Sequence, residues 1–145
     1  MHYPAYIGDV EFDPVQDDAG FKICNPHYIA QYYNFGRGVQ FNGEKSKIMD
    51  HFKKYYQANR FAGENGYVKI RFIVNCEGYS GRFRAEEMDF NLEPKTFGKG
   101  MTKELLKITS NLQGWAVATH ETNAFDYYQH LVFKIEDGKI TEIMP

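Results

Sequence analysis

The chain has 145 residues, of which 43% are hydrophobic and 25% are charged, so it has the composition of one ordinary globular domain and not of a disordered chain. Its net charge of −2 and the scatter of its basic residues argue against a nucleic-acid-binding protein. No apolar run is long enough to span a membrane, and the first residues lack the basic head and apolar core of a signal peptide. We therefore expect either a cytosolic protein or one whose export signal has been removed from this chain.

An N-terminal extension packed on the domain is predicted for residues 1–41. Two short apolar pieces flank an acidic, glycine-containing turn at residues 16–20. The stretch HYIAQYYNF has the composition of a strand and carries no helix start signal. The extension is therefore expected to be irregular, with short strands.

The main domain is expected over residues 42–145 and opens with an amphipathic helix. Asn42-Gly43 is a turn signal, and residues 44–59 then place apolar side chains at helical spacing among lysines. This pattern predicts a helix with one apolar stripe that ends between Asn59 and Gly63.

A β-hairpin is predicted next. Residues 67–76 alternate apolar and polar side chains, and Glu77-Gly78 supplies a turn before the return strand at 79–90. Ile73 interrupts the polar side of the first strand, which indicates that this face of the sheet is partly covered. Two arginines at 82 and 84 share one face of the return strand; they could hold an anion or a carboxylate, or simply form a solvated face.

A second helix is predicted over residues 103–113. Thr102 is its expected N-cap, and Gly114 is expected to stop it in the left-handed conformation. Trp115 follows at once and is predicted to fill the core beside the end of the helix.

A second hairpin completes the domain. Residues 126–135 predict a strand, and Asp137-Gly138 is a two-residue turn signal before a last short strand at 139–144. The predicted fold class is α+β, with a small antiparallel sheet and two helices packed on one face.

No catalytic or metal-binding pattern emerges from the sequence. None of the five histidines stands at zinc-ligand spacing from another histidine, a cysteine or a carboxylate. Nucleophile motifs, phosphate loops and calcium loops are also missing. We therefore expect no enzyme, no metal site and no cofactor. Cys24 and Cys76 are compatible with one disulfide or with two free thiols.

The order and spacing of these elements resemble the TonB carboxy-terminal domain family. The resemblance rests on the stretch GENGYVKIRFIVNCEGYSGRFR, on a helix that ends in NLQGW, on DYYQHLVFKI, and on FNGEKSKIMDHF as an opening helix. It covers residues 42–136. The positions that carry it are Gly66, Val68, Phe72, Val74, Gly78, Leu105, Leu112, Trp115, Phe133 and Ile135.

The sequence also departs from the family pattern, as a divergent relative from a Bacteroidetes-type envelope would. The return strand runs on into AEEMDFNLEPKTF, and Trp115 is followed by Ala116 and Val117 instead of a proline. Residues before 42 have no counterpart, and the strand at 139–144 extends beyond the family's usual end.

The resemblance implies a non-catalytic protein of the periplasm or cell envelope that binds a protein partner. TonB-type domains pair an extended peptide of an outer-membrane receptor with the edge of their last strand. The full-length protein would then be anchored in a membrane or through a lipid. Carried over to this chain, the partner-binding strand comprises Tyr127, Tyr128, Gln129, His130, Leu131, Val132, Phe133, Lys134 and Ile135.

An envelope location also implies a disulfide between Cys24 and Cys76, since periplasmic thiols are oxidised. If the strand at 139–144 folds back on its neighbour, the peptide-binding edge is closed or moves to this new terminal strand. The alternative function is then a structural or accessory envelope domain with a capped edge. Such a domain would bind a partner or a glycan through its tyrosine-rich N-terminal segment, around Tyr28, Tyr32 and Tyr33.

Overall fold

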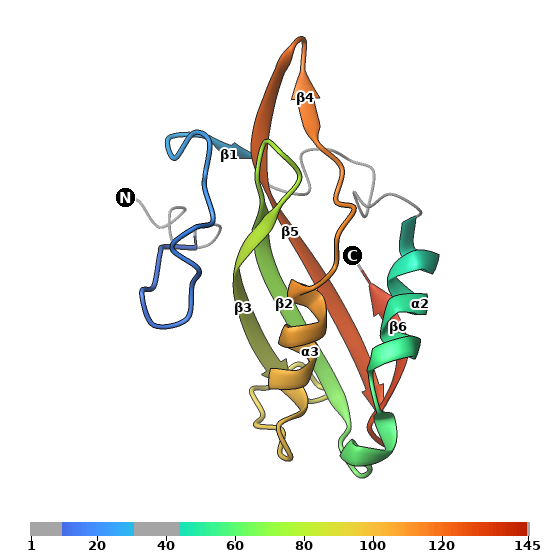
Figure 1. Ribbon diagram of the computed structural model, residues 1–145. Coiled ribbons are helices and arrows are strands. Elements are labelled where there is room, and N and C mark those ends of the chain that lie inside the picture. The colour runs from blue at the N-terminus through green and yellow to red at the C-terminus, as the bar shows by residue number, and fades with distance from the viewer. Residues whose placement is uncertain (1–9, 31–43, 145) are drawn as a thin grey trace.

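The computed structural model describes residues 10–30 and 44–144, which form an α+β fold on one mixed, six-stranded sheet (Figure 1). The two α-helices of the described residues lie on the same side of this sheet, so the predicted α+β class is confirmed at this level. The elements in chain order are β1 (Ile29–Ala30), α2 (Glu44–Tyr55), the 3₁₀ helix η2 (Ala58–Phe61), β2 (Gly66–Val74), β3 (Ser80–Met88), α3 (Met101–Ser110), β4 (Ala118–His120), β5 (Asn123–Glu136) and β6 (Lys139–Met144).

The 14-residue strand β5 is the centre of the sheet. On one side β2 runs antiparallel along it and is paired in turn with β3. On its other side β5 pairs with β1 and then with β6, and the short strand β4 forms a hairpin with the first residues of β5. The expectation of a purely antiparallel sheet is corrected, because β1 pairs with β5 in parallel. β1 comes from a distant segment and not from a hairpin, so no tight turn fixes its direction.

The core lies between the sheet and the two helices. The alternation predicted for the first strand of the hairpin is confirmed, since Val68, Ile70, Phe72 and Val74 of β2 are fully buried in this core. Trp115 closes one end of the core, with 5.0 Å between its ring centroid and that of Phe72, as predicted for this residue.

The first helix matches its prediction apart from its length. Ile48 and Phe52 lie on the buried stripe of α2, and the ring of Phe52 packs on Phe133 of β5 with 4.9 Å between centroids. α2 ends at Tyr55, and the turn that was expected to continue it forms η2 instead. The fully buried side chain of Phe61 draws this separate turn into the core.

The predicted caps of the second helix are wrong. Gly100 is the N-cap of α3, in the left-handed conformation at φ 74°, and Thr102 lies inside the helix, where its hydroxyl donates a hydrogen bond to the Glu87 carboxylate. The helix ends at its C-cap, Asn111, so Gly114 lies beyond it. A glycine before the helix makes the tight entry possible without a side-chain cap.

The second face of the sheet is partly covered, as Ile73 predicted. Val10, Ile73 and Tyr128 bury one another there, and the backbone N–H of Val10 donates to the Tyr128 hydroxyl at 2.9 Å. Val10, Phe21 and Ile23 of the N-terminal segment therefore pack against the side of the sheet that the helices leave open.

The turn between β5 and β6 fits closely against η2. Gly138 adopts φ 78°, and a side chain at this position would place its Cβ 2.4 Å from the Phe61 carbonyl oxygen. Its backbone N–H donates to the Glu64 carbonyl at 2.8 Å. Glycine is required at this point by both the backbone conformation and the lack of space.

Candidate functional site

The strand predicted to bind a partner lies inside the sheet. β2 flanks it on one side, and β6 pairs with residues 132–136 on the other. No further strand can be added at 132–136, so the edge is closed there, which is one of the two cases that the sequence left open. The cause is the Asp137-Gly138 turn, which folds β6 back onto β5. Five of the expected contact residues are fully buried, namely Tyr127, Gln129, Leu131, Phe133 and Ile135.

Tyr127 illustrates the structural role of these side chains. Its hydroxyl donates a hydrogen bond to the Ala116 carbonyl at 2.8 Å, and burial raises its pKa well above the ordinary value. Tyr128 is 4% exposed, and Arg71 lies 5.4 Å from its ring centroid. Within residues 127–135, His130, Val132 and Lys134 are the partly exposed ones.

The edge of the sheet on this side is β6. Among the described residues, β6 pairs with β5 alone, which leaves the backbone groups of its outer side without a paired strand. A cavity of about 250 Å³ lies between the start of β6, η2 and α2. We call it the β6 groove; its lining residues are Met49, Phe52, Lys53, Tyr56, Ala58, Lys139 and Ile140.

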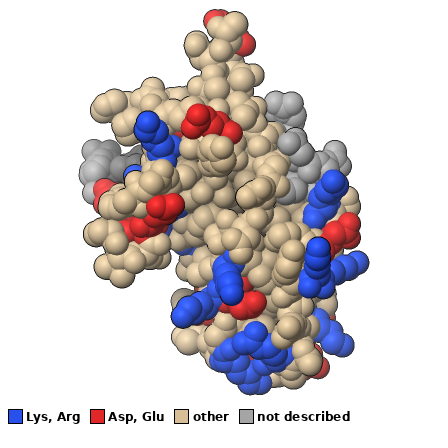
Figure 2. Space-filling view, viewed as in Figure 1, with Lys and Arg blue, Asp and Glu red and all other residues tan. Residues whose placement is uncertain are grey.

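The β6 groove has an apolar floor and a basic rim. Tyr56 is half-buried, its hydroxyl donates to the Gly138 carbonyl at 2.6 Å, and burial raises its pKa. Lys53 and Lys139 are exposed at the two walls. Lysine side chains also gather on the surface of α2 (Figure 2). This charge distribution favours a ligand with acidic groups.

Asp126 is the residue that sequence analysis missed. Its side chain is fully buried near the start of β5, and its carboxylate accepts hydrogen bonds from three backbone N–H groups. The donors are Cys24 at 3.1 Å, Asn25 at 2.9 Å and Cys76 at 3.0 Å. One carboxylate thus joins the N-terminal segment, the β2–β3 hairpin and β5. No local pattern reveals it, because its partners are at least 50 residues away.

The predicted disulfide is confirmed: Cys24 and Cys76 are bonded, with their Cα atoms 6.1 Å apart. The two sulfur atoms and the Asp126 carboxylate lie within 4.8 Å of one another, and they are the one group with metal-ligand composition in the described part of the chain. A bonded sulfur is not a thiolate, and the carboxylate is already engaged by backbone donors, so this group is a structural crosslink.

The two arginines of the return strand hold the chain's own N-terminal segment. Arg84 forms a bidentate ion pair with Asp17. The distances from Nη1 to Oδ1 and from Nη2 to Oδ2 are both 2.8 Å. Arg82 donates to the Val10 carbonyl at 3.0 Å. The carboxylate that the sequence suggested as a partner for these arginines is therefore Asp17 of the same chain.

This ion pair predicts acid sensitivity of the N-terminal segment. The hydrogen bonds from Arg84 hold the pKa of Asp17 below its ordinary value near 3.8. The stabilisation is therefore fully present above that pH and is lost as the pH falls through the lowered folded-state pKa. We expect Asp17→Asn to lower the unfolding free energy by about 1–2 kcal/mol at neutral pH. Urea titrations should show the difference from wild type shrinking below about pH 4.

Exposed Asp50 supplies the control for this measurement. Asp50→Asn removes the same charge from the surface of α2 and should change stability by less than about 0.5 kcal/mol. An Asp17→Asn effect that stays constant down to strong acid would contradict the ion pair as its source.

No helix among the described residues has both the length and the apolar character needed to cross a membrane. The chain was also compared with models of known protein families, with curated proteins and with solved structures. None of the three comparisons found a match.

Proposed function

We propose that this chain is a non-catalytic, TonB-like protein-binding module of the cell envelope that pairs an extended partner segment with the outer edge of β6. The observation that carries the proposal is the coincidence of a strand edge with the β6 groove. An added strand would bond to the outer backbone groups of β6, which no strand of the described residues pairs, and would place alternate side chains toward α2. The edge moves by one strand relative to the family pattern, because β6 covers β5.

The chemistry of the β6 groove indicates the kind of segment that fits. Met49, Tyr56 and Ile140 offer partly buried apolar surface to one set of side chains. Lys53 and Lys139 offer ammonium groups at the rim, which favour carboxylates on the incoming segment. We therefore expect a partner segment in which apolar and acidic residues alternate.

The disulfide supports the proposed location in the cell envelope. A bond between Cys24 and Cys76 is compatible with an oxidising compartment such as the periplasm, and it would be kept reduced in most cytosolic environments. An envelope location is the one at which a TonB-like module would meet its partner.

A peptide titration tests the proposal. A synthetic peptide of alternating valine and glutamate residues is added to the ¹⁵N-labelled chain. We expect saturable shifts of the amides of β6, and a roughly threefold to tenfold loss of affinity in Lys53→Glu, because the substitution reverses a rim charge. Lys103→Glu, on the exposed side of α3, is the matched control and should bind like wild type.

Two results would contradict β6 as the binding edge. One is a titration in which the chemical shifts of the β6 amides do not change. The other is an equal loss of affinity in Lys53→Glu and Lys103→Glu. Shifts around Tyr28 and Phe125 instead would favour the accessory-domain alternative. Tyr28 is 55% exposed and packs edge-on against Phe125, with 6.0 Å between ring centroids. Tyr32 and Tyr33 of that alternative lie outside the described residues.

A further inference from the structure

The positive charge of the chain is concentrated on the side of the sheet that the helices cover. Residues 46–61 and 98–113 comprise η2, α3 and most of α2, and we call their outer surface the helical face. Of the 17 basic and 19 acidic residues of the chain, seven basic and two acidic ones fall in these ranges, so the helical face carries a net charge of +5 while the whole chain carries −2. Figure 2 shows Lys and Arg side chains gathered over this side of the molecule.

Lysines of the helical face are exposed and lack acidic partners. Lys47 of α2 and both Lys103 and Lys107 of α3 are exposed. In the described part of the chain, none of these three ammonium groups forms an ion pair with a carboxylate. Arg84 on the other face differs, because Asp17 neutralises its charge. The positive charge of the helical face is therefore offered to an external anionic partner.

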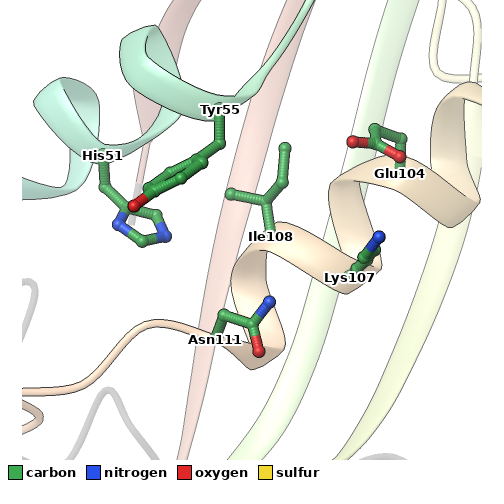
Figure 3. Close-up of a pocket in the computed structure, with 6 residues that line it drawn as sticks. All are labelled: His51, Tyr55, Glu104, Lys107, Ile108 and Asn111. Atoms are coloured by element: carbon green, nitrogen blue, oxygen red, sulfur yellow. The ribbon is translucent and has the colours of Figure 1, made fainter.

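The arrangement of this charge does not suit a small anion. A single phosphate or carboxylate is best recognised by several donors that converge on it. A cavity of about 370 Å³ lies between α2 and α3, but Lys107 is the one basic residue of the helical face that lines it (Figure 3). Glu104 lines the same wall and would repel an anion drawn to Lys107. The charge is spread over two helices and is not focused in a pocket.

A lipid surface matches the helical face better than a protein partner does. The cores of protein interfaces are depleted in lysine and enriched in aromatic residues. Among the described residues of the helical face, Tyr55 is the one exposed large hydrophobic side chain, at 50% exposure. Tyrosine suits the headgroup level of a bilayer, because it has an apolar body and a polar tip. Lysines on flexible stems can follow headgroups that move laterally.

We propose that the helical face docks on the surface of an anionic lipid bilayer. Its ammonium groups are attracted to the lipid phosphates, and Tyr55 lies among the headgroups. The remainder of the chain is acidic and is repelled by the same surface, so the bilayer also orients the molecule. Attachment depends on charge and is reversed by salt, since little apolar surface is exposed on this face. Docking does not require the β6 edge, so it goes beyond the function proposed above.

Vesicle sedimentation of the whole chain tests this docking. We expect the chain to sediment with vesicles of equal parts phosphatidylcholine and phosphatidylglycerol, and to stay in solution with phosphatidylcholine alone. Sodium chloride at about 0.5 M should release it. The double substitution Lys47→Gln with Lys107→Gln should weaken binding roughly twentyfold, because each lysine near an anionic surface contributes roughly a factor of five. Both side chains are exposed, so the variant should keep the wild-type fold.

Lys22→Gln with Lys69→Gln is the matched control. It removes the same charge from the other side of the sheet, because Lys22 belongs to the N-terminal segment and Lys69 shares its face of β2 with Ile73. This variant should bind within about twofold of wild type, since these charges lie beyond the screening length from the bilayer.

Three results would overturn the proposal. The first is equal sedimentation with the anionic and the neutral vesicles, or none with either. The second is an equal loss of binding in the two double variants. The third is a chain that stays in solution with the anionic vesicles while soluble polyglutamate shifts the amides of Lys47 and Lys107, since the helical face would then recognise an acidic polypeptide.

Discussion

Reduction of the Cys24–Cys76 disulfide is expected to lower the free energy of unfolding by about 4 kcal/mol, the loop-entropy value for a crosslink over 52 residues. The bond joins the N-terminal segment to the end of β2, so the reduced unfolded chain gains the freedom that the crosslink removes. Since domains of this size are stable by roughly 5–15 kcal/mol, the loss would be a large part of the total. Urea unfolding with and without reductant measures it.

The reduced protein should lose its N-terminal packing before its core. Val10 and Phe21 pack on Ile73 and Tyr128 of the second face, whereas the helices pack on the opposite face. Chemical shifts of Ile73 and Tyr128 should therefore change on reduction, and those of Leu105 should stay close to their oxidised values. The double substitution Cys24→Ser with Cys76→Ser serves as a control that excludes effects of the reductant. A stability unchanged by reduction would contradict the crosslink's contribution.

Local patterns predicted the helices and the two hairpins well, because their causes are local. Alternation along residues 67–76 and the Asp137-Gly138 turn depend on neighbours in sequence, and both are observed. The helix entry at Gly100 was missed, since Thr102 looks like a cap by its residue type while its hydroxyl bonds to distant Glu87. The parallel pairing of β1 with β5 was also missed, because the partner strand is distant in sequence and no residue near Ile29 specifies the pairing.

The candidate site was less predictable than the fold. The sequence indicated that a strand at 139–144, folded back on its neighbour, closes or moves the peptide edge, but not that α2 and β6 together form a groove. Its two walls, Lys53 and Lys139, are far apart in sequence and meet only through the tertiary fold. Asp126 looked like an ordinary polar residue at a strand start, and its donors come from two other segments.

The Asp126 carboxylate gives the second large effect. Asp126→Ala removes a fully buried carboxylate and leaves three backbone N–H groups without their acceptor at a part-buried junction, and we expect a loss of about 3–5 kcal/mol in unfolding free energy. Asp126→Asn keeps the shape and one acceptor oxygen but turns an NH₂ group toward a donor, so about 1–3 kcal/mol is expected. Denaturant unfolding of both variants, with exposed Asp50→Ala as the surface control, measures the series. Equal stability of Asp126→Ala and Asp50→Ala would contradict the role assigned to this carboxylate.

The disulfide and the carboxylate hold the same junction, so their effects should not add. Oδ1 of Asp126 accepts the N–H groups of both bonded cysteines, and the crosslink in turn keeps those donors close to the carboxylate. When the crosslink is removed first, the donors of Cys24 and Asn25 can turn to water, and Asp126→Ala then exposes fewer unsatisfied groups. A double-mutant cycle between reduction and Asp126→Ala is therefore expected to give a combined loss smaller than the sum by about 1–2 kcal/mol, as for contacting groups in one network. Strict additivity would mean that the carboxylate and the disulfide stabilise separate parts of the chain.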